Sequence, residues 1–248
     1  MDNNIERATD ITSAQGDIYT RTALMLGDEA VARLKGASVL IFGLGGVGGY
    51  TAEALARAGV GRLGLVDMDR VAPSNLNRQI VATHDTVGML KTEAAKTRIL
   101  SINPSAQVDT YPVFYGGDGE GEPNICDYGY AVDAIDTVSS KLTVIRRAKE
   151  AGVELISCMG TGNKLDPTRF RIDDISKTRE CPLARAVRQG MKKQGLSGLT
   201  VLWSDEPPIH LGQRCPGSVS FVPSVAGLII AGEMIKRIIG DNTPPRAE

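Results

Sequence analysis

The stretch that decides the fold is Ala37-Ser-Val-Leu-Ile-Phe-Gly43, followed at once by Leu-Gly-Gly-Val-Gly48. Its apolar run is short and continuous, as in a strand that is buried on both faces of a parallel sheet. The glycines allow a tight turn, and Tyr50–Gly59 has the composition of a helix that ends at a glycine. Strand, glycine turn and helix in immediate succession predict the first half of a βαβ unit.

The same alternation continues along the chain. Arg62–Asp67 reads as a second buried strand, which ends on an acidic residue and completes the βαβ unit. The elements expected beyond it are a helix over Lys91–Ile102, strands near Ala106–Tyr111 and Tyr130–Ala134, a helix over Ser139–Ala151 and a strand over Glu154–Met159. This order predicts an α/β fold with a doubly wound, mostly parallel, Rossmann-like sheet.

The chain changes character beyond Gly160. Two predicted strands, Arg169–Asp173 and Leu199–Trp203, flank a predicted helix over Leu183–Lys193. A final helix is expected over Pro223–Ile239, because apolar residues recur there at helical spacing. The glycines of this helix that we expect to allow close packing are Gly227 and Gly232. The sheet therefore has a C-terminal extension of strands and helices.

Composition excludes several classes of protein. The 248 residues carry a formal net charge of −1, which argues against binding nucleic acid over the whole surface. No apolar stretch reaches the roughly 18 residues of a membrane span, and Met1–Asp10 lacks the features of a secretory signal. We therefore expect a cytoplasmic protein without membrane contact. Cys126, Cys158, Cys181 and Cys215 form no C-x-x-C pair, so we expect free thiols.

A glycine turn between a strand and a helix is suited to binding phosphate. Small residues let the backbone approach the phosphate at the positive end of the helix. The acidic residue at the end of the next strand, Asp67, can accept hydrogen bonds from ribose hydroxyls. The motif alone does not distinguish a dinucleotide from ATP.

The segment after Asp67 favours ATP. Asn75, Arg78 and Gln79 follow closely, and Lys91 comes after a short loop. A dinucleotide has no need of two cations and two amides at this place, whereas a triphosphate does. Arg78 offers a bidentate fork and Lys91 a compact charge, which together complement a polyphosphate.

The glycine turn, the block Asp67–Gln79, Lys91 and the strand end Val132–Asp136 together resemble the ThiF/MoeB superfamily of ubiquitin-activating-like adenylating enzymes. The resemblance implies that Asp67 binds the ribose of ATP and that Asp136 binds Mg²⁺. It also implies an arginine that reaches into the partner subunit's site, and Arg21 is the matching position. A homodimer is therefore expected.

The resemblance and the residue pattern together define the expected site. The residues expected to contact the nucleotide are Gly43, Gly45, Gly46, Gly48, Asp67, Asp69, Ser74, Asn75, Arg78, Gln79, Lys91, Asp136 and Thr137. The residues expected to act in catalysis are Arg21, Arg78, Lys91 and Asp136. ATP and Mg²⁺ are the expected cofactors, with Asp136 as the metal ligand.

The C-terminal part resembles one member family. Carrier-protein adenylators of this superfamily commonly have two C-x-x-C pairs that bind zinc, and this chain has none. The stretches that look like the tRNA threonylcarbamoyladenosine dehydratase family are Gly160–Thr168, Asp174–Thr178, Cys181–Ala184 and Pro216–Gly227. We expect one domain over residues 1–248, with its ATP-binding part in residues 20–160 and its substrate-side and dimer part in residues 161–240.

The charge is unevenly distributed. The segment Lys164–Lys193 holds nine basic and four acidic residues, a net charge of +5, so the remainder carries −6. A cationic region on an acidic body is what contact with a phosphate backbone needs, and an ordinary solvated helix face would explain the charges as well. We expect tRNA to bind through this segment.

Cys181 allows two interpretations. It precedes Pro182 at the start of a predicted helix, where the positive helix end could acidify the thiol. Some members of the superfamily use a cysteine in this region for an acyl intermediate. We favour a packed, unreactive thiol, because adenylate chemistry is sufficient for a dehydration.

The resemblance implies ATP-dependent dehydration of N6-threonylcarbamoyladenosine in tRNA. The threonyl carboxylate would be adenylated, and a neighbouring atom of the same side chain would then close a ring and expel AMP. Positioning is sufficient for such an intramolecular step, in agreement with the lack of an obvious catalytic histidine.

Three alternatives remain at this stage. An adenylyltransferase for the C-terminus of a ubiquitin-like sulfur-carrier protein would share the ATP residues, with a carrier or sulfur-transfer protein as its partner. A nicotinamide-dependent dehydrogenase would leave Arg78 and Lys91 unexplained. A nucleotide-sensing or scaffold protein would bind ATP without turnover.

Overall fold

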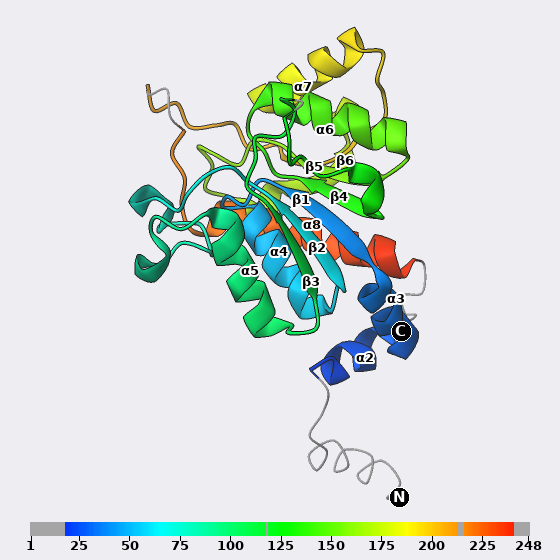
Figure 1. The fold of residues 1–248 in the computed structure, drawn as a ribbon. Coiled ribbons are helices and arrows are strands. Elements are labelled where there is room, and N and C mark those ends of the chain that lie inside the picture. The colour runs from blue at the N-terminus through cyan, green and yellow to red at the C-terminus, as the bar shows by residue number, and fades with distance from the viewer. Residues whose placement is uncertain (1–17, 118, 213–215, 241–248) are drawn as a thin grey trace, which may run out of the picture.

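Seven strands form one sheet in the order β3-β2-β1-β4-β5-β7-β6 (Figure 1). The computed structural model describes residues 18–117, 119–212 and 216–240. The strands are β1 (Ser38–Phe42), β2 (Arg62–Val66), β3 (Gln107–Tyr111), β4 (Tyr130–Asp133), β5 (Glu154–Cys158), β6 (Phe170–Asp174) and β7 (Thr200–Ser204). All neighbouring strands are parallel except β6, which runs antiparallel to β7. The predicted α/β fold class is confirmed.

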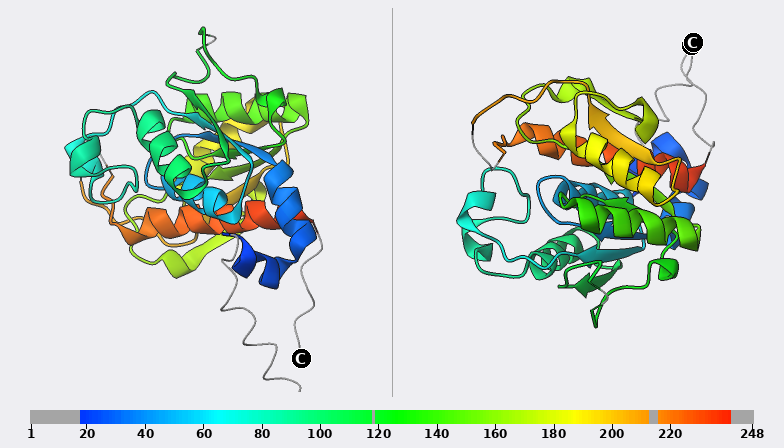
Figure 2. Two further views of the ribbon diagram at one scale, coloured as in Figure 1. Left: turned by 60° about the horizontal axis from the view of Figure 1, so that its bottom comes forward. Right: turned by 90° about the horizontal axis from the view of Figure 1, so that it is seen from above.

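Helices cover both faces of the sheet (Figure 1). The helices are α2 (Thr20–Leu26), α3 (Asp28–Gly36), α4 (Gly48–Ala58), α5 (Lys91–Ile102), α6 (Val138–Ala151), α7 (Pro182–Lys193) and α8 (Phe221–Ile239). On one face α4 packs against α5 and α8, and on the other α6 packs against α7. Figure 2 shows α8, in orange and red, along the first of these layers. None of the helices in the described ranges is both long and apolar enough to cross a bilayer.

The continuous apolar run of β1 is explained by burial on both sides. Val39 and Ile41 belong to the core on the side of α4 and α8, whereas Leu40 and Phe42 belong to the core on the side of α6 and α7. All four side chains are fully buried. The predicted elements agree with the observed ones to within two residues at each end.

The glycine turn after β1 has two positions at which only glycine fits. Gly43 has a φ angle of +85°, and a Cβ atom there would lie 2.8 Å from the carbonyl oxygen of Ala134. A Cβ atom at Gly48 would lie 1.8 Å from the carbonyl oxygen of Gly43. Helix α4 therefore begins directly against the end of β1, which places its N-terminus at the edge of the sheet.

The packing of α8 against α4 depends on one of the two glycines singled out in the sequence. A Cβ atom at Gly227 would lie 2.3 Å from the carbonyl oxygen of Val47, and Thr51 Oγ1 donates to the carbonyl oxygen of Gly227 over 3.1 Å. The expectation for Gly232 is wrong, because nothing lies within 4 Å of a Cβ atom built there. Helical spacing could not show which of the two glycines faces α4.

We expect Gly227→Ala to lower the free energy of unfolding by about 1–3 kcal/mol, because the added methyl group would push α8 away from α4. Gly232→Ala is the matched control. It is expected to leave stability unchanged or to raise it by up to about 1 kcal/mol, since alanine has the higher helix propensity. Urea unfolding followed by circular dichroism measures both. Equal stabilities of the two variants would contradict the packing argument.

Candidate nucleotide-binding site

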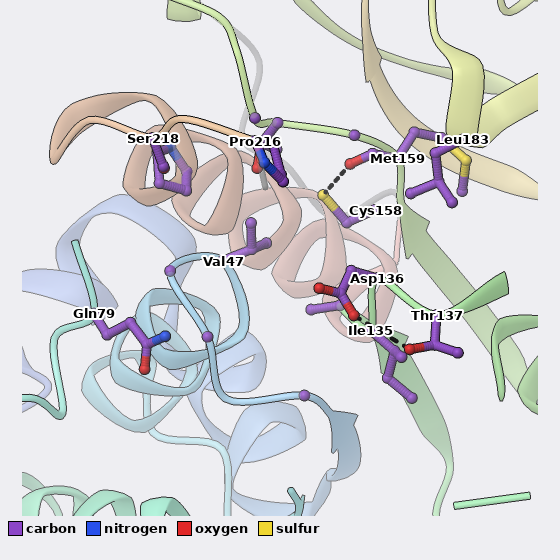
Figure 3. Close-up of a pocket in the computed structure, with 18 of the residues that line it drawn as sticks. Val47, Gln79, Ile135, Asp136, Thr137, Cys158, Met159, Leu183, Pro216 and Ser218 are labelled. Atoms are coloured by element: carbon purple, nitrogen blue, oxygen red, sulfur yellow. Dashed lines mark hydrogen bonds between the residues drawn. The ribbon is translucent and has the colours of Figure 1, made fainter. Parts of the chain in front are cut away.

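A cavity of about 780 Å³ opens at the carboxyl ends of the parallel strands. The loops that follow β1, β2, β3, β4 and β5 all contribute to its lining. Figure 3 shows Val47 and Gln79 on one side of it, Asp136 and Thr137 after β4, and Pro216 and Ser218 from the segment before α8. Ligands of open α/β sheets bind at this edge, so the position of the cavity fits the predicted site.

Most of the predicted nucleotide contacts lie in this cavity. The predicted residues that line it are Gly43, Gly45, Gly46, Asp67, Asp69, Asn75, Arg78, Gln79, Lys91, Asp136 and Thr137. Gly48, Ser74 and Arg21 do not line it. Gly48 allows α4 to begin against the end of β1. The carbonyl oxygen of Ser74 accepts a hydrogen bond from Arg78 over 2.9 Å.

Asp67 connects the end of β2 to the glycine turn. Its carboxylate accepts a hydrogen bond of 2.7 Å from the backbone N–H of Leu44 and one of 2.8 Å from that of Asp69. Lys91 Nζ lies 2.7 Å from Asp69 Oδ2 and 3.7 Å from Asp67 Oδ2. Burial raises the pKa of Asp67, while Lys91 and the two N–H groups oppose this effect. The carboxylate and the lysine are thus held in place at the cavity wall.

The side chain of Gln79 is the clearest sign of a polar ligand. It is buried, it lines the cavity, and its Oε1 has no hydrogen-bond partner within the described residues. A buried acceptor without a partner is costly unless a ligand supplies the donor. Its Nε2 lies 4.0 Å from the position of a Cβ atom at Gly45, so it sits beside the glycine turn. This arrangement fits a nucleotide on that turn.

Asn75 ends a short helical turn over Pro73–Asn75, and Arg78 lies in the turn that follows it. The Oδ1 atom of Asn75 accepts from the backbone N–H of Ala72 over 3.0 Å, which shapes the turn. The guanidinium of the half-buried Arg78 donates only to uncharged oxygens, those of Ser74 and Asn77. Because it has no carboxylate partner within the described ranges, its charge is available to an anionic ligand.

The loop that carries Asp136 rests on a buried ion pair. Lys141 Nζ and Asp133 Oδ2 are 2.8 Å apart with both side chains fully buried, and Ser157 Oγ donates to the same oxygen over 2.6 Å. Asp133 Oδ1 accepts from the N–H of Ile135 over 3.1 Å. The carboxylate of Asp136 itself is exposed and accepts from Thr137 Oγ1 over 3.4 Å. Weakly engaged carboxylate oxygens of this kind suit Mg²⁺.

Two cysteines lie in the cavity wall. Burial raises the pKa of Cys158 to about 12, and its Sγ donates to the carbonyl oxygen of Met159. Cys181 is buried and begins α7, where its Sγ accepts from the N–H of Ala184 over 3.5 Å. Cys126 is exposed, and these three cysteines are free thiols, as predicted. Cys215 lies outside the described residues.

Sequence reasoning did not assign several cavity residues to the site. The unassigned residues include Val113, Phe114, Tyr115, Ser140, Lys164, Leu183, Pro208 and Pro223. Val113–Tyr115 follow the end of β3, and their place after a predicted parallel strand was a usable signal. Pro208 and Pro223 carried no such signal, because Pro208 lies in the long connection between β7 and α8 and Pro223 lies in the first turn of α8.

Comparison with known proteins places the chain among adenylating enzymes. The ThiF family matches residues 19–248. The tRNA threonylcarbamoyladenosine dehydratase of Bacillus subtilis is 41% identical over 243 residues, which cover 90% of this chain and 95% of that protein. The crystal structure of the Escherichia coli tRNA N6-threonylcarbamoyladenosine dehydratase in complex with ATP superposes with a TM-score of 0.82 at 32% identity, covering 89% of this chain and 93% of that one.

A relative with adenylyltransferase and sulfurtransferase in its name is more distant. The adenylyltransferase and sulfurtransferase UBA4 of Candida glabrata is 34% identical over 66% of this chain, which spans only 38% of that protein. The family match, the extent of identity and the shared fold together show that the chain belongs to the ThiF family and, within it, to the family of tRNA threonylcarbamoyladenosine dehydratases.

Proposed function

We propose that the protein catalyses the ATP-dependent dehydration of N6-threonylcarbamoyladenosine in tRNA, with ring closure through a carboxyl-adenylate. The observation that carries the proposal is one cavity that joins the glycine turn, Arg78 and Lys91 to the segments 160–164 and 216–218. The first group suits a triphosphate, and the second leaves room for a second substrate beside it. A tRNA substrate also fits the expected cytoplasmic location.

ATP would be held by residues that the cavity already orients. The glycine turn offers backbone N–H groups to the phosphates, Asp67 accepts from the ribose, and Gln79 accepts from a donor on the nucleotide. Arg78 and Lys91 would balance the charge of the phosphates. Asp136 would hold Mg²⁺, which when bound supplies further positive charge at the phosphates.

The reaction balances without an additional reagent. An oxygen of the threonyl carboxylate attacks the α-phosphorus, and pyrophosphate leaves. A nucleophilic atom of the same side chain then attacks the activated carbonyl carbon, loses its proton and expels AMP, which retains the carboxylate oxygen. The nucleoside loses one water in total. Arg78 and Lys91 stabilise the charge that develops on the phosphates, and the cavity supplies positioning for ring closure.

The decisive measurement is mass spectrometry of nucleosides from tRNA incubated with the protein, ATP and Mg²⁺. We expect the threonylcarbamoyl nucleoside to lose the mass of one water. Lys91→Ala should reduce the rate by about a hundredfold or more, because it removes a phosphate contact and leaves Asp67 and Asp69 without their cation. Lys96→Ala, on the same helix but outside the cavity lining, is the control and should remain active.

The alternative substrate is the C-terminus of a ubiquitin-like carrier protein. It is favoured only by the ATP residues, which both kinds of enzyme would share. Pyrophosphate exchange that requires a small protein with a Gly-Gly tail, and not tRNA, would replace our proposal with this one.

We also propose that the active form is a homodimer in which Arg21 completes the partner subunit's site. Helices α2 and α3 lead into the amino end of β1, whereas the cavity lies at the carboxyl ends of the strands. Arg21 is exposed on α2 and lines no part of its own subunit's cavity. Nearby apolar side chains are exposed, with Leu24 at 67% and Met25 at 71%, which supports a partner contact here.

Mixing Arg21→Ala with Lys91→Ala subunits should restore activity. Half of the randomly formed dimers would be hybrids with one intact site each, so we expect about a quarter of the wild-type rate. Arg21→Ala mixed with the double variant Arg21→Ala/Lys91→Ala is the control, since no intact site can form. Absence of rescue in the first mixture would argue against delivery of Arg21 from the partner.

We further propose that tRNA contacts an arginine cluster in the basic segment. Arg169, Arg171 and Arg179 lie 2.8, 3.3 and 3.8 Å from the carboxylate of Asp205. The guanidinium of Arg169 holds the pKa of Asp205 below its usual range. Three cations around one anion leave an excess of positive charge, and Arg171 and Arg179 are 59% and 69% exposed. Such a cluster suits phosphates of a nucleic acid.

The double variant Arg171→Gln/Arg179→Gln should bind tRNA several-fold more weakly at low salt, and the slope of log affinity against log salt should decrease by about 1 to 2. Filter binding over a range of salt concentrations measures both. Arg57→Gln, which removes a charge from α4 on the other face of the sheet, is expected to leave the slope unchanged. An unaltered slope in the double variant would show that Arg171 and Arg179 do not contact the phosphates of tRNA.

A further inference from the structure

One cation of the cavity wall has no role in the mechanism so far. Lys164 follows the end of β5, lines the cavity and is only 5% exposed. Burial lowers its pKa, and the nearby Cys181, Glu206 and Asp205 oppose this effect. An ammonium group held in a buried position needs a compensating anion, because desolvation of the charge is costly.

The backbone around Lys164 is held firmly. The preceding residue, Asn163, has a φ angle of +58°, and its N–H and Oδ1 bond to the carbonyl oxygen and N–H of Gly217 over 2.8 and 2.6 Å. Its carbonyl oxygen accepts from the N–H of Ile209 over 2.8 Å. Three chain segments therefore meet at Asn163. Gly217 lies between Pro216 and Ser218, which Figure 3 shows at the cavity.

The ammonium group of Lys164 has no carboxylate counter-ion among the described residues. It donates to the carbonyl oxygen of Glu206, and no carboxylate oxygen lies within 4.0 Å of Nζ in the described ranges. The carboxylate of Glu206 is occupied by the N–H groups of Leu165 and Asp166, over 2.8 and 3.1 Å. The carboxylate of Asp205 is shared by three arginines.

The other lysines near the cavity differ from Lys164 in their ionic partners. Lys91 lies 2.7 Å from Asp69, and Lys141 lies 2.8 Å from Asp133, so each has an anionic partner within the chain. Of the three N–H donors of Lys164, one is directed to Glu206, which leaves two for a ligand. An anion that enters the cavity would therefore supply the charge that Lys164 lacks among the described residues.

We propose that Lys164 binds the carboxylate of the threonylcarbamoyl group and thereby selects the modified adenosine. This inference rests on the proposed function, under which the substrate carries one carboxylate that must come to the α-phosphorus of ATP. The phosphates already have Arg78 and Lys91 beside the glycine turn. An unmodified adenosine has no carboxylate and would leave the buried ammonium group unpaired, which gives discrimination against it.

The test compares Lys164→Met with Lys164→Arg, which retains the charge. With tRNA that contains N6-threonylcarbamoyladenosine, we expect Lys164→Met to reduce kcat/KM for tRNA about tenfold to a hundredfold, the usual effect of losing a charge-assisted hydrogen bond. The KM for ATP should stay within about twofold of the wild-type value. Lys164→Arg should retain most of the activity. Affinity for unmodified tRNA, measured by filter binding, should be the same in all three proteins.

The outcomes separate the possible roles of Lys164. A higher KM for ATP with unchanged tRNA kinetics would assign Lys164 to the nucleotide and overturn the proposal. Equal losses of affinity for modified and unmodified tRNA would make it a backbone contact, which also overturns it. The melting temperature of Lys164→Met should equal or exceed that of the wild type, because a buried unpaired charge has been removed. A wild-type protein that forms no product would instead refute the proposed function itself.

Discussion

The close approach of helix α4 to the end of strand β1 is the constraint on which the rest of the structure depends. A Cβ atom at Gly48 would lie 1.8 Å from the carbonyl oxygen of Gly43, so the helix begins there only because both residues are glycines. The contact directs the helix N-terminus at the cavity. It also places Val47 against Gly227, so the same turn determines where α8 packs. The proposed phosphate site and the core packing therefore share one set of backbone contacts.

Charge pairing within the chain distinguishes Lys141 and Lys91 from Lys164. Lys141 is fully buried with Asp133 and supports the loop of Asp136, and Lys91 is held by Asp69. Buried charges are tolerated when a partner and further hydrogen bonds compensate the lost solvation. Lys164 lacks such a partner among the described residues, and a carboxylate of the substrate would supply it. Under the proposed function, the second substrate would therefore complete the charge pairing of the cavity.

Much of the nucleotide site could be predicted because its residues are close in sequence. Residues such as Asp67, Asn75 and Lys91 follow the glycine turn at short spacing, and consecutive parallel strands bring such loops to one edge. Ser74, predicted to contact the nucleotide, does not line the cavity, because spacing does not show which side chains of a short turn face inward. The roles of Asp136 and Arg21 remain predictions.

The sequence by itself determined the α/β fold, the order of its elements and the position of the glycine turn. These follow from the spacing of apolar residues, the composition and the spacing of glycines, which are local properties of the chain. The tertiary structure decided the contacts between distant segments. It joined Asn163 to Gly217, separated the packing glycine from Gly232, and buried Lys164 beside Glu206 with no carboxylate partner in the part of the chain that the structure describes. Burial and the loss of solvent around a charge arise only when segments far apart in the chain meet, and no local pattern encodes them.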